Sequence, residues 1–165
     1  MKNTRFALLF VALLLLPSTM MAQLQRSQDF KGKYQLKEVV ILSRHNIRAP
    51  LSDNGSALGR LTPHAWTHWS SGASELTTRG GVLETMMGQY FRKWVVSEGL
   101  FKENAVPTAS EVNFYANSMQ RTIATAQYFS SGFMPLANLH INHRYTASKM
   151  DPVFTPRLTK LSEAF

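Results

Sequence analysis

Cysteine is absent from all 165 residues of this chain. Its absence excludes a small scaffold held by disulfide bonds, thiolate metal ligands and a cysteine nucleophile. Internal repeats and low-complexity segments are absent as well. The fold must therefore be held by packing alone, and the chain is long enough to form one domain with a hydrophobic core.

Runs of basic residues are also lacking, although the formal net charge at pH 7 is +8. The lysines and arginines are scattered and do not alternate with aromatic residues, as they do in many nucleic-acid-binding segments. We therefore expect no nucleic-acid partner. A positive charge spread in this way suits a small anionic substrate.

Only one long apolar run is present, over residues 6–16, shortly after Lys2 and Arg5. It is shorter than the roughly 20 residues that a membrane span needs. The pattern predicts a signal peptide over residues 1–22 and a periplasmic or secreted protein with no stable membrane span after cleavage. An uncleaved membrane anchor is the alternative. Removing residues 1–22 leaves 16 basic and 10 acidic residues.

The first part of the mature chain changes character twice. Residues 23–33 are polar and predict a mobile N-terminus, followed by one domain over residues 34–165. The β-branched residues and unbroken apolar run within residues 37–43 predict a buried strand. Residues 49–75 are rich in proline and glycine and predict a long irregular loop, and loops of this length are often functional.

A helical period follows that loop. Thr77 or Thr78 is placed to cap the helix, and Gly99 is placed to end it. The apolar residues recur at helical spacing and predict a face that packs into the core. These residues are Val82, Leu83, Met86, Met87, Tyr90, Phe91, Trp94 and Val95.

The rest of the chain continues the alternation of strands and helices. Residues 112–116 predict a second strand, and residues 139–143 predict a third. Ser118 is placed to cap the helix between them. The apolar positions of that helix are expected to face a sheet; they are Ile123, Ala124, Ala126 and Phe129. This order predicts an α/β fold with a largely parallel sheet and flanking helices.

Chemistry-bearing residues follow two of the predicted strands. His45 lies between Arg44 and Arg48 after the first strand, and Arg121 follows the second. The carboxyl ends of parallel strands meet at one edge of a sheet, where α/β folds bind ligands. Guanidinium groups there can hold a doubly charged oxyanion, and a histidine can attack it. Each residue taken alone also fits an ordinary structural or solvated role.

Residues 39–50 resemble the signature of the histidine acid phosphatases, branch 2 of the histidine phosphatase superfamily, which begins with Arg-His-Gly-x-Arg-x-Pro. Asn46 stands in place of the motif glycine. Residues 76–81, 115–122 and 150–152 are similar to later segments of the family. The resemblance covers residues 34–165, and it is strongest to periplasmic bacterial members that act on sugar or inositol phosphates.

The resemblance implies a three-layer histidine-phosphatase fold, here incomplete. It implies that His45 is the nucleophile and forms a phosphohistidine, while Arg44, Arg48 and Arg121 bind the phosphate oxygens of a small phosphorylated substrate. It implies no metal and no organic cofactor. The family works at acidic pH, where a donor acid stays protonated and can protonate the leaving alkoxide.

One family element is missing. The family's later His-Asp pair, whose aspartate protonates the leaving group, has no counterpart here, because no His-Asp dipeptide occurs. Asp53, Glu75 and Asp151 are poor substitutes, and Asp151 is expected to be a turn residue. We therefore expect the N-terminal portion of a phosphatase that needs its C-terminal portion and is weakly active or inactive alone.

Three alternatives remain open at this stage. The chain is a phosphate-binding remnant without turnover, a phosphoglycerate-mutase-like enzyme, or a non-functional remnant of a longer gene. The predicted signal peptide argues against the second, because those enzymes are cytosolic. Without further strands beside it, the strand at residues 37–43 becomes a sheet edge, so we expect the chain alone to be marginally stable or prone to aggregate.

Overall fold

The computed structural model describes residues 28–52, 57–64, 67–146 and 148–155. The chain forms two compact units, residues 1–35 and residues 36–165. In the first unit, helix α2 (Gln28–Lys33) is followed by Tyr34, whose ring centroid lies 4.6 Å from that of Phe30. The predicted signal peptide lies outside the described residues. The mobility of residues 23–33 and the three segment boundaries stay predictions.

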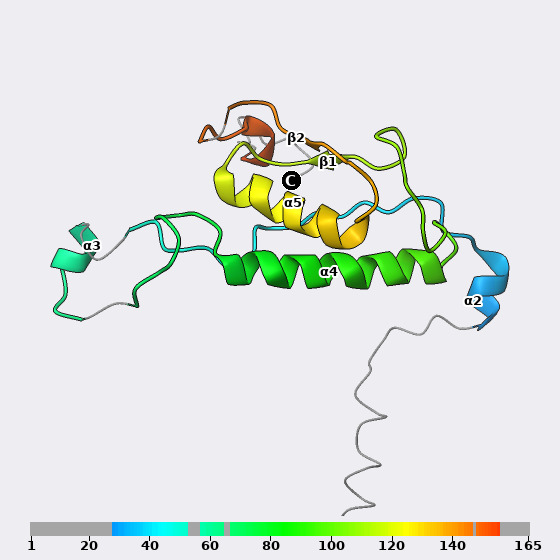
Figure 1. Ribbon diagram of the computed structural model, residues 1–165, viewed down its shortest axis with the longest axis horizontal. Coiled ribbons are helices and arrows are strands. Elements are labelled where there is room, and N and C mark those ends of the chain that lie inside the picture. The colour runs from blue at the N-terminus through cyan, green and yellow to red at the C-terminus, as the bar shows by residue number, and fades with distance from the viewer. Residues whose placement is uncertain (1–27, 53–56, 65–66, 147, 156–165) are drawn as a thin grey trace, which may run out of the picture. The chain divides into compact units, whose positions relative to one another are not determined.

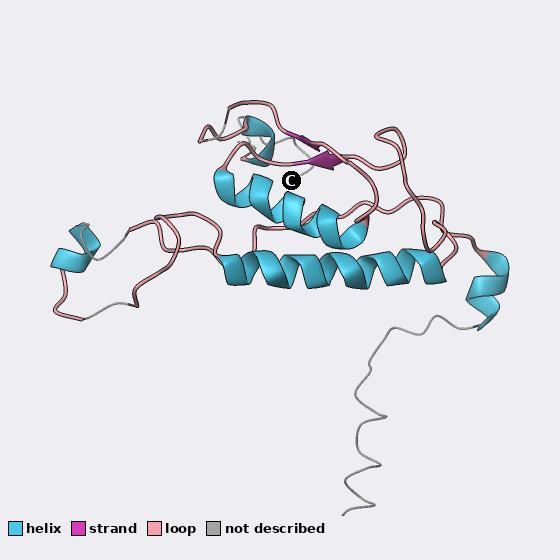
Figure 2. Cartoon of the chain, in the orientation of Figure 1, coloured by secondary structure: helices cyan, strands magenta, loops and turns pink. Residues whose placement is uncertain are grey.

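The second unit contains the sheet and the long helices (Figures 1 and 2). Helix α5 lies between helix α4 and a pair of short strands, and it contacts both. None of the described helices is long and apolar enough to cross a membrane. In chain order the elements are α3 (Ala57–Arg60), α4 (Thr78–Ser97), β1 (Phe114–Tyr115), α5 (Gln120–Phe133), β2 (Ile141–Asn142) and the short 3-10 helix η2 (Pro152–Phe154).

The two strands are parallel, and α5 is the crossover between them. Phe114 pairs with Ile141, and Tyr115 pairs with Asn142. The predicted strands at residues 112–116 and 139–143 are thus present in the right order, although each is only two residues long. An α/β arrangement with a parallel sheet and flanking helices is confirmed.

The prediction of a strand at residues 37–43 is wrong. In the structure this segment is neither strand nor helix. Val40 is 76% exposed and Leu42 is 94% exposed, while Val39 packs against the core. A strand needs a neighbour for its backbone N–H and C=O groups. No described residue makes a backbone hydrogen bond to this segment, and β1 pairs with β2 instead.

Helix α4 begins and ends as its sequence predicts. The Thr77 hydroxyl accepts a hydrogen bond from the Gly80 N–H at 3.0 Å, which caps the first turn. Gly99, just beyond the end, has φ +75°, a left-handed conformation that favours glycine. The local signals in the sequence therefore place both ends of this helix correctly.

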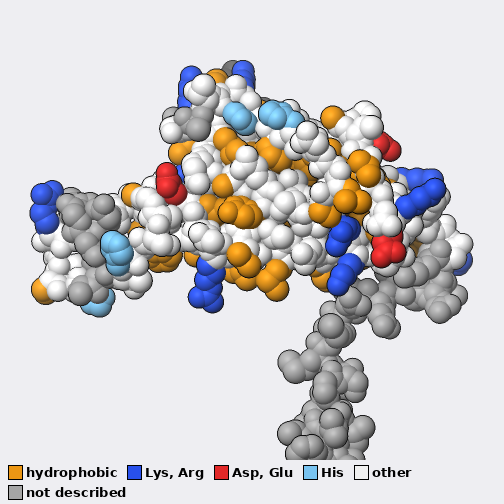
Figure 3. Space-filling view, viewed as in Figure 1, with side chains coloured by type: hydrophobic (Ala, Val, Ile, Leu, Met, Phe, Trp, Pro, Cys, Tyr) orange, Lys and Arg blue, Asp and Glu red, His pale blue; other side chains and the backbone are white. Residues whose placement is uncertain are grey.

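The predicted core face of α4 is wrong over most of its length. Val82, Met86 and Tyr90 are each more than half exposed, and only the last part of the face, at Phe91, Trp94 and Val95, reaches the core. Figure 3 shows hydrophobic side chains gathered on the surface over the region of α4 and α5. The face that is buried carries small residues and one acid: Gly80, Gly81, Glu84, Gly88 and Val95.

Glycines explain why the small-residue face of α4, and not its large apolar face, is buried. A side chain at Gly88 would run into the carbonyl oxygen of Phe129, and one at Gly132 would run into that of Thr85. The backbones of α4 and α5 therefore approach closely, and the larger apolar side chains of α4 are left on the outside. Beyond the glycines, Phe129 and Phe133 of α5 pack with Val95 and Met134 to form the core.

The start of α5 also differs from the expectation. Its N-cap is Met119, whose side chain makes no capping hydrogen bond. Ser118, the predicted cap, is fully buried, and its hydroxyl accepts a hydrogen bond from the Tyr145 N–H at 2.9 Å. Ser118 thus fixes a later loop rather than capping the helix. Of the positions predicted to face the sheet, Phe129 is buried and packs against Phe114.

Candidate active site

The segment of residues 44–48, here named the motif loop, rests on the start of α4. Arg48 forms an antiparallel bridge with Leu76. The Ile47 carbonyl accepts hydrogen bonds from the N–H of Thr77 at 3.0 Å and from its hydroxyl at 2.9 Å. The Ala49 N–H donates to the Glu75 carbonyl at 2.9 Å. The loop is therefore held by backbone contacts although no strand precedes it.

His45 is half-buried, and one of its ring nitrogens is engaged. Its Nδ1 lies 2.8 Å from the carbonyl oxygen of Asn46. A carbonyl oxygen can only accept a hydrogen bond, so this contact assigns the proton to Nδ1. In the neutral ring the lone pair then resides on Nε2. His45 is thus in the tautomer that a nucleophile attacking through Nε2 requires.

Arg48 and Arg121 form a positive pair. Burial lowers the pKa of Arg121, and the positive charge of Arg48 lowers it further. The Nε of Arg121 is buried and has no hydrogen-bond partner among the described residues. No described carboxylate forms an ion pair with either arginine. An unneutralised pair with a free buried donor is suited to binding an anion.

A polar link ties the motif loop to the helix turn that carries Arg121. The Asn46 N–H donates to the Thr125 hydroxyl at 3.3 Å, and that hydroxyl donates to the Arg121 carbonyl at 2.7 Å. The structure thus connects Asn46, the neighbour of His45, to Arg121, and the positive charge of Arg48 acts on Arg121. The Arg44 side chain is exposed, and no contact within the described residues joins it to the other three. The roles of all four stay predictions.

Two polar residues near the motif loop were not predicted from the sequence. Glu84 is buried and accepts a hydrogen bond from the Asn46 side-chain amide at 2.6 Å. Thr125 is buried and joins the two segments as described above. A signal for Glu84 exists, because it is the only acidic residue of α4 and falls outside the apolar pattern. Thr125 carries no comparable signal.

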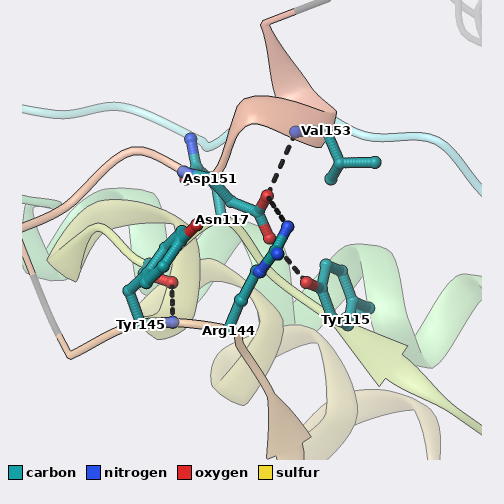
Figure 4. Close-up of polar contacts among 7 residues, drawn as sticks. Tyr115, Asn117, Arg144, Tyr145, Asp151 and Val153 are labelled. Atoms are coloured by element: carbon teal, nitrogen blue, oxygen red, sulfur yellow. Dashed lines mark hydrogen bonds and ion pairs between the residues drawn. The ribbon is translucent and has the colours of Figure 1, made fainter.

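Asp151 is not placed as a proton donor. Its side chain is fully buried, accepts hydrogen bonds from the Tyr115 hydroxyl at 2.6 Å and the Val153 N–H at 3.0 Å, and caps η2 (Figure 4). The Tyr115 hydroxyl, followed by the Val153 N–H, lowers the pKa of Asp151. The Asp151 N–H donates to the Asn117 side chain at 2.9 Å. Asp151 is therefore the expected turn residue, and it ties the last described loop to the end of β1.

Of the other two acids that the sequence offers as candidates, the structure describes only Glu75. Glu75 is exposed, and its carboxylate accepts a hydrogen bond from the Gly72 N–H at 3.2 Å. Asp53 lies outside the described residues. Over the described ranges, no group of three or more potential ligand side chains is arranged to hold a metal ion. That the protein needs no metal or cofactor stays a prediction.

A shallow hollow of about 410 Å³ borders the motif loop. Ile47 contributes to its wall, and Thr77 and Arg79 line it from the start of α4. The remaining lining residues, His68, Trp69 and Ser70, come from the long loop at residues 49–75. Residues 68–70 of the loop that the sequence marks as a functional candidate therefore lie beside the motif loop.

Comparison with known proteins shows the family to which the chain belongs. The family model of the histidine phosphatase superfamily (branch 2) matches residues 35–160. The chain is 43% identical over 165 residues to glucose-1-phosphatase of Salmonella typhimurium, and the match covers all of this chain and 39% of that protein. It is 32% identical over 146 residues to phytase AppA of Escherichia coli, covering 88% of this chain and 33% of that protein.

Solved structures give the same result. The apo form of the phytase from Hafnia alvei superposes with a TM-score of 0.66 at 36% identity, covering 73% of this chain and 29% of that one. The chain thus spans about two-fifths or less of the length of the curated relatives described here. The family match extends over most of the chain and includes the motif loop and Arg121. This chain belongs to branch 2 of the histidine phosphatase superfamily.

Proposed function

We propose that this chain carries the phosphate-binding and nucleophilic part of a phosphomonoesterase that works through a phosphohistidine. The observation that carries the proposal is the His45 ring, held at Nδ1, in a loop that contains Arg48 and is tied to the helix turn of Arg121. No carboxylate in the described part of the chain pairs with either arginine. Arg44 completes the proposed phosphate-binding set.

The reaction has two steps. The lone pair on Nε2 of His45 attacks phosphorus, a new N–P bond forms, and the bond from phosphorus to the ester oxygen breaks. The leaving oxygen takes up a proton and departs as an alcohol. Water then attacks phosphorus, the N–P bond breaks, and inorganic phosphate leaves. The arginines stabilise the charge on the phosphate oxygens throughout both steps.

The substrate class is inferred from relatives and from the hollow beside the motif loop. Relatives with 43% and 32% identity are a glucose-1-phosphatase and a phytase. A phytase of Hafnia alvei is known in complex with myo-inositol hexakis sulphate. We infer a sugar phosphate such as glucose-1-phosphate, or an inositol phosphate, in a periplasmic or secreted setting. Trp69 and His68 lie in the wall of the hollow, and we propose that they contact the ring of such a substrate.

The proton for the leaving group is proposed to come from further polypeptide. The acids of the described site are engaged elsewhere, because Glu84 binds Asn46 and Asp151 binds Tyr115. The chain alone should therefore react well only with esters whose leaving group needs no proton. Losing a general acid costs about 100- to 10,000-fold in rate on other esters.

The test uses the 165-residue chain and radiolabelled p-nitrophenyl phosphate, whose weakly basic leaving group needs no donor acid. We expect an acid-labile label on His45, a burst of p-nitrophenolate, and far slower release of phosphate from glucose-1-phosphate. His45→Ala removes the nucleophile, and His140→Ala is the matched control at an exposed histidine. Label that persists in His45→Ala excludes His45 as the nucleophile.

A second candidate is a phosphate-binding module without turnover. It is favoured by the same observation that the two buried acids, Glu84 and Asp151, accept hydrogen bonds from Asn46 and Tyr115. Such a module binds phosphate or vanadate through Arg48 and Arg121 but leaves p-nitrophenyl phosphate intact. Calorimetric binding of vanadate with no label on His45 would favour this candidate over the enzyme.

A further inference from the structure

Glu84 is an unusual residue for the buried face of α4. That face is otherwise formed by glycines and Val95, yet the Glu84 side chain is only 4% exposed. A buried carboxylate is costly unless hydrogen bonds compensate it. Its partner here is the side-chain amide of Asn46, whose Nδ2 donates to Oε2 at 2.6 Å. The acid of α4 therefore holds the residue that follows the proposed nucleophile.

Asn46 is bound at each of its polar groups. Its amide Nδ2 contacts Glu84 of α4, and its backbone N–H contacts Thr125 of α5. Its side-chain oxygen accepts a hydrogen bond from the Ile47 N–H at 2.8 Å. Its backbone carbonyl is the group that contacts Nδ1 of His45. Asn46 thus connects the ring of His45 to both long helices.

We propose that Glu84 is a positioning residue, which acts through Asn46 to hold the ring of His45 in the orientation and tautomer needed for attack. If Asn46 turns, its carbonyl leaves Nδ1, and the ring can then carry its proton on Nε2, which blocks attack on phosphorus. A misplacement of about 1 Å at a reacting group can cost about 100-fold in rate. The inference rests on the proposed function, because it assigns His45 as the nucleophile.

The first test exchanges the two partners. Asn46→Asp removes the donor and places a second carboxylate against Glu84. The double variant Asn46→Asp with Glu84→Gln restores one hydrogen bond with its polarity reversed. At neutral pH we expect the single variant to form phosphohistidine about 100-fold more slowly than the original chain, with vanadate affinity changed less than about threefold. The double variant should return to within about tenfold of the original rate.

A second variant covers the case in which Asn46→Asp does not fold. Glu84→Met removes the acceptor, brings no new charge, and has a similar volume. We expect the same slow phosphohistidine formation with little change in vanadate affinity. Glu103→Gln is the control, because it removes one exposed acid far from the motif loop. A simple loss of structure would weaken vanadate binding together with the rate.

Two results would overturn the proposal. One is a folded Glu84→Met chain that reacts at the original rate, and the other is a double variant no faster than Asn46→Asp. Nitrogen NMR of the labelled His45 ring gives an independent readout, since the proton should leave Nδ1 in Glu84→Met and stay in the control. If the original chain forms no phosphohistidine, the proposed function fails, and the ring tautomer alone then decides whether Glu84 positions His45.

Discussion

Gly80→Ala tests whether the motif loop depends on its close approach to α4. Gly80 lies in the first turn of α4, where a Cβ atom would run into the carbonyl oxygen of Ile47 and lie 3.0 Å from its N. Both atoms belong to the backbone of the motif loop. No flexible side chain is available to give way, so either the loop or the helix must move.

The size of the effect follows from the geometry. Restoring an ordinary contact between Cβ and a carbonyl oxygen requires a shift of about 1 Å, which can cost about 100-fold in rate at a site that depends on alignment. Overpacking costs about 1–3 kcal/mol of stability, whereas replacing glycine by alanine inside a helix gains at most about 1 kcal/mol. We therefore expect Gly80→Ala to be destabilised by about 1–2 kcal/mol and to form phosphohistidine about 100-fold more slowly.

The assay measures the rate of His45 labelling by p-nitrophenyl phosphate and the urea midpoint by circular dichroism. Gly32→Ala is the matched control, because Gly32 lies in α2 and a Cβ there has nothing within 4 Å. The control should keep the original rate and midpoint. A Gly80→Ala chain with an unchanged rate and midpoint would show that the motif loop adapts to α4 freely, and the reasoning would be wrong.

Two further predictions concern stability. The lowered pKa of Asp151 means that its ionised form stabilises the fold, with the full effect above the ordinary value of 3.8 and loss as the pH falls through the lower folded value. Asp151→Asn should therefore lower the urea midpoint at neutral pH and flatten its fall in acid; an unchanged pH profile would contradict this. On the exposed face of α4, Met86→Lys with Tyr90→Lys should reduce light scattering by aggregates and change stability by less than about 1 kcal/mol. Phe91→Lys, at a partly buried residue that packs against the core, should unfold the chain. Equal losses of stability in the two variants would show that the face with Met86 and Tyr90 is packed.

The sequence predicts those features of the fold that depend on local signals. The cap at Thr77 and the left-handed Gly99 mark α4 because each acts within one helical turn. The parallel pair of strands around α5 follows from the alternation of periods. The prediction of a strand at residues 37–43 is wrong because a strand is not determined by local signals alone. It depends on a neighbouring strand that its own residues do not specify.

The buried face of α4 shows a second limit. Apolar periodicity assigns the core to the side with Met86 and Tyr90, since large apolar residues usually face inward. Gly88 and Gly132 override that rule by allowing two helix backbones to meet. A search for glycines at helical spacing, with Glu84 between them, would have found the correct face. The prediction that Ser118 caps α5 is also wrong, because its buried hydroxyl accepts a hydrogen bond from Tyr145 in a distant loop.

The sequence singles out the residues of the candidate site, but it does not show which partners the acids near them have. His45, Arg48 and Arg121 stand out by type and position, and the structure places them on connected segments. What the sequence does not show is how the buried acids are used. The Asp151 carboxylate is occupied by Tyr115, and the Glu84 carboxylate is occupied by Asn46. Neither forms an ion pair with the two arginines in the described part of the chain.

This use of the acids has two consequences for the proposed reaction. No described carboxylate pairs with Arg48 or Arg121, so in the proposed reaction their charge acts on a phosphate dianion. The Nε of Arg121, which has no partner among the described residues, would give that dianion a hydrogen-bond donor. Because both buried acids are held as acceptors, neither is placed to give a proton to a departing alkoxide. In the proposed reaction, binding of the phosphate and attack by His45 are thus separated from protonation of the leaving group. Sensitivity of the rate to leaving-group basicity is therefore the property that distinguishes this site from one that holds its own donor acid.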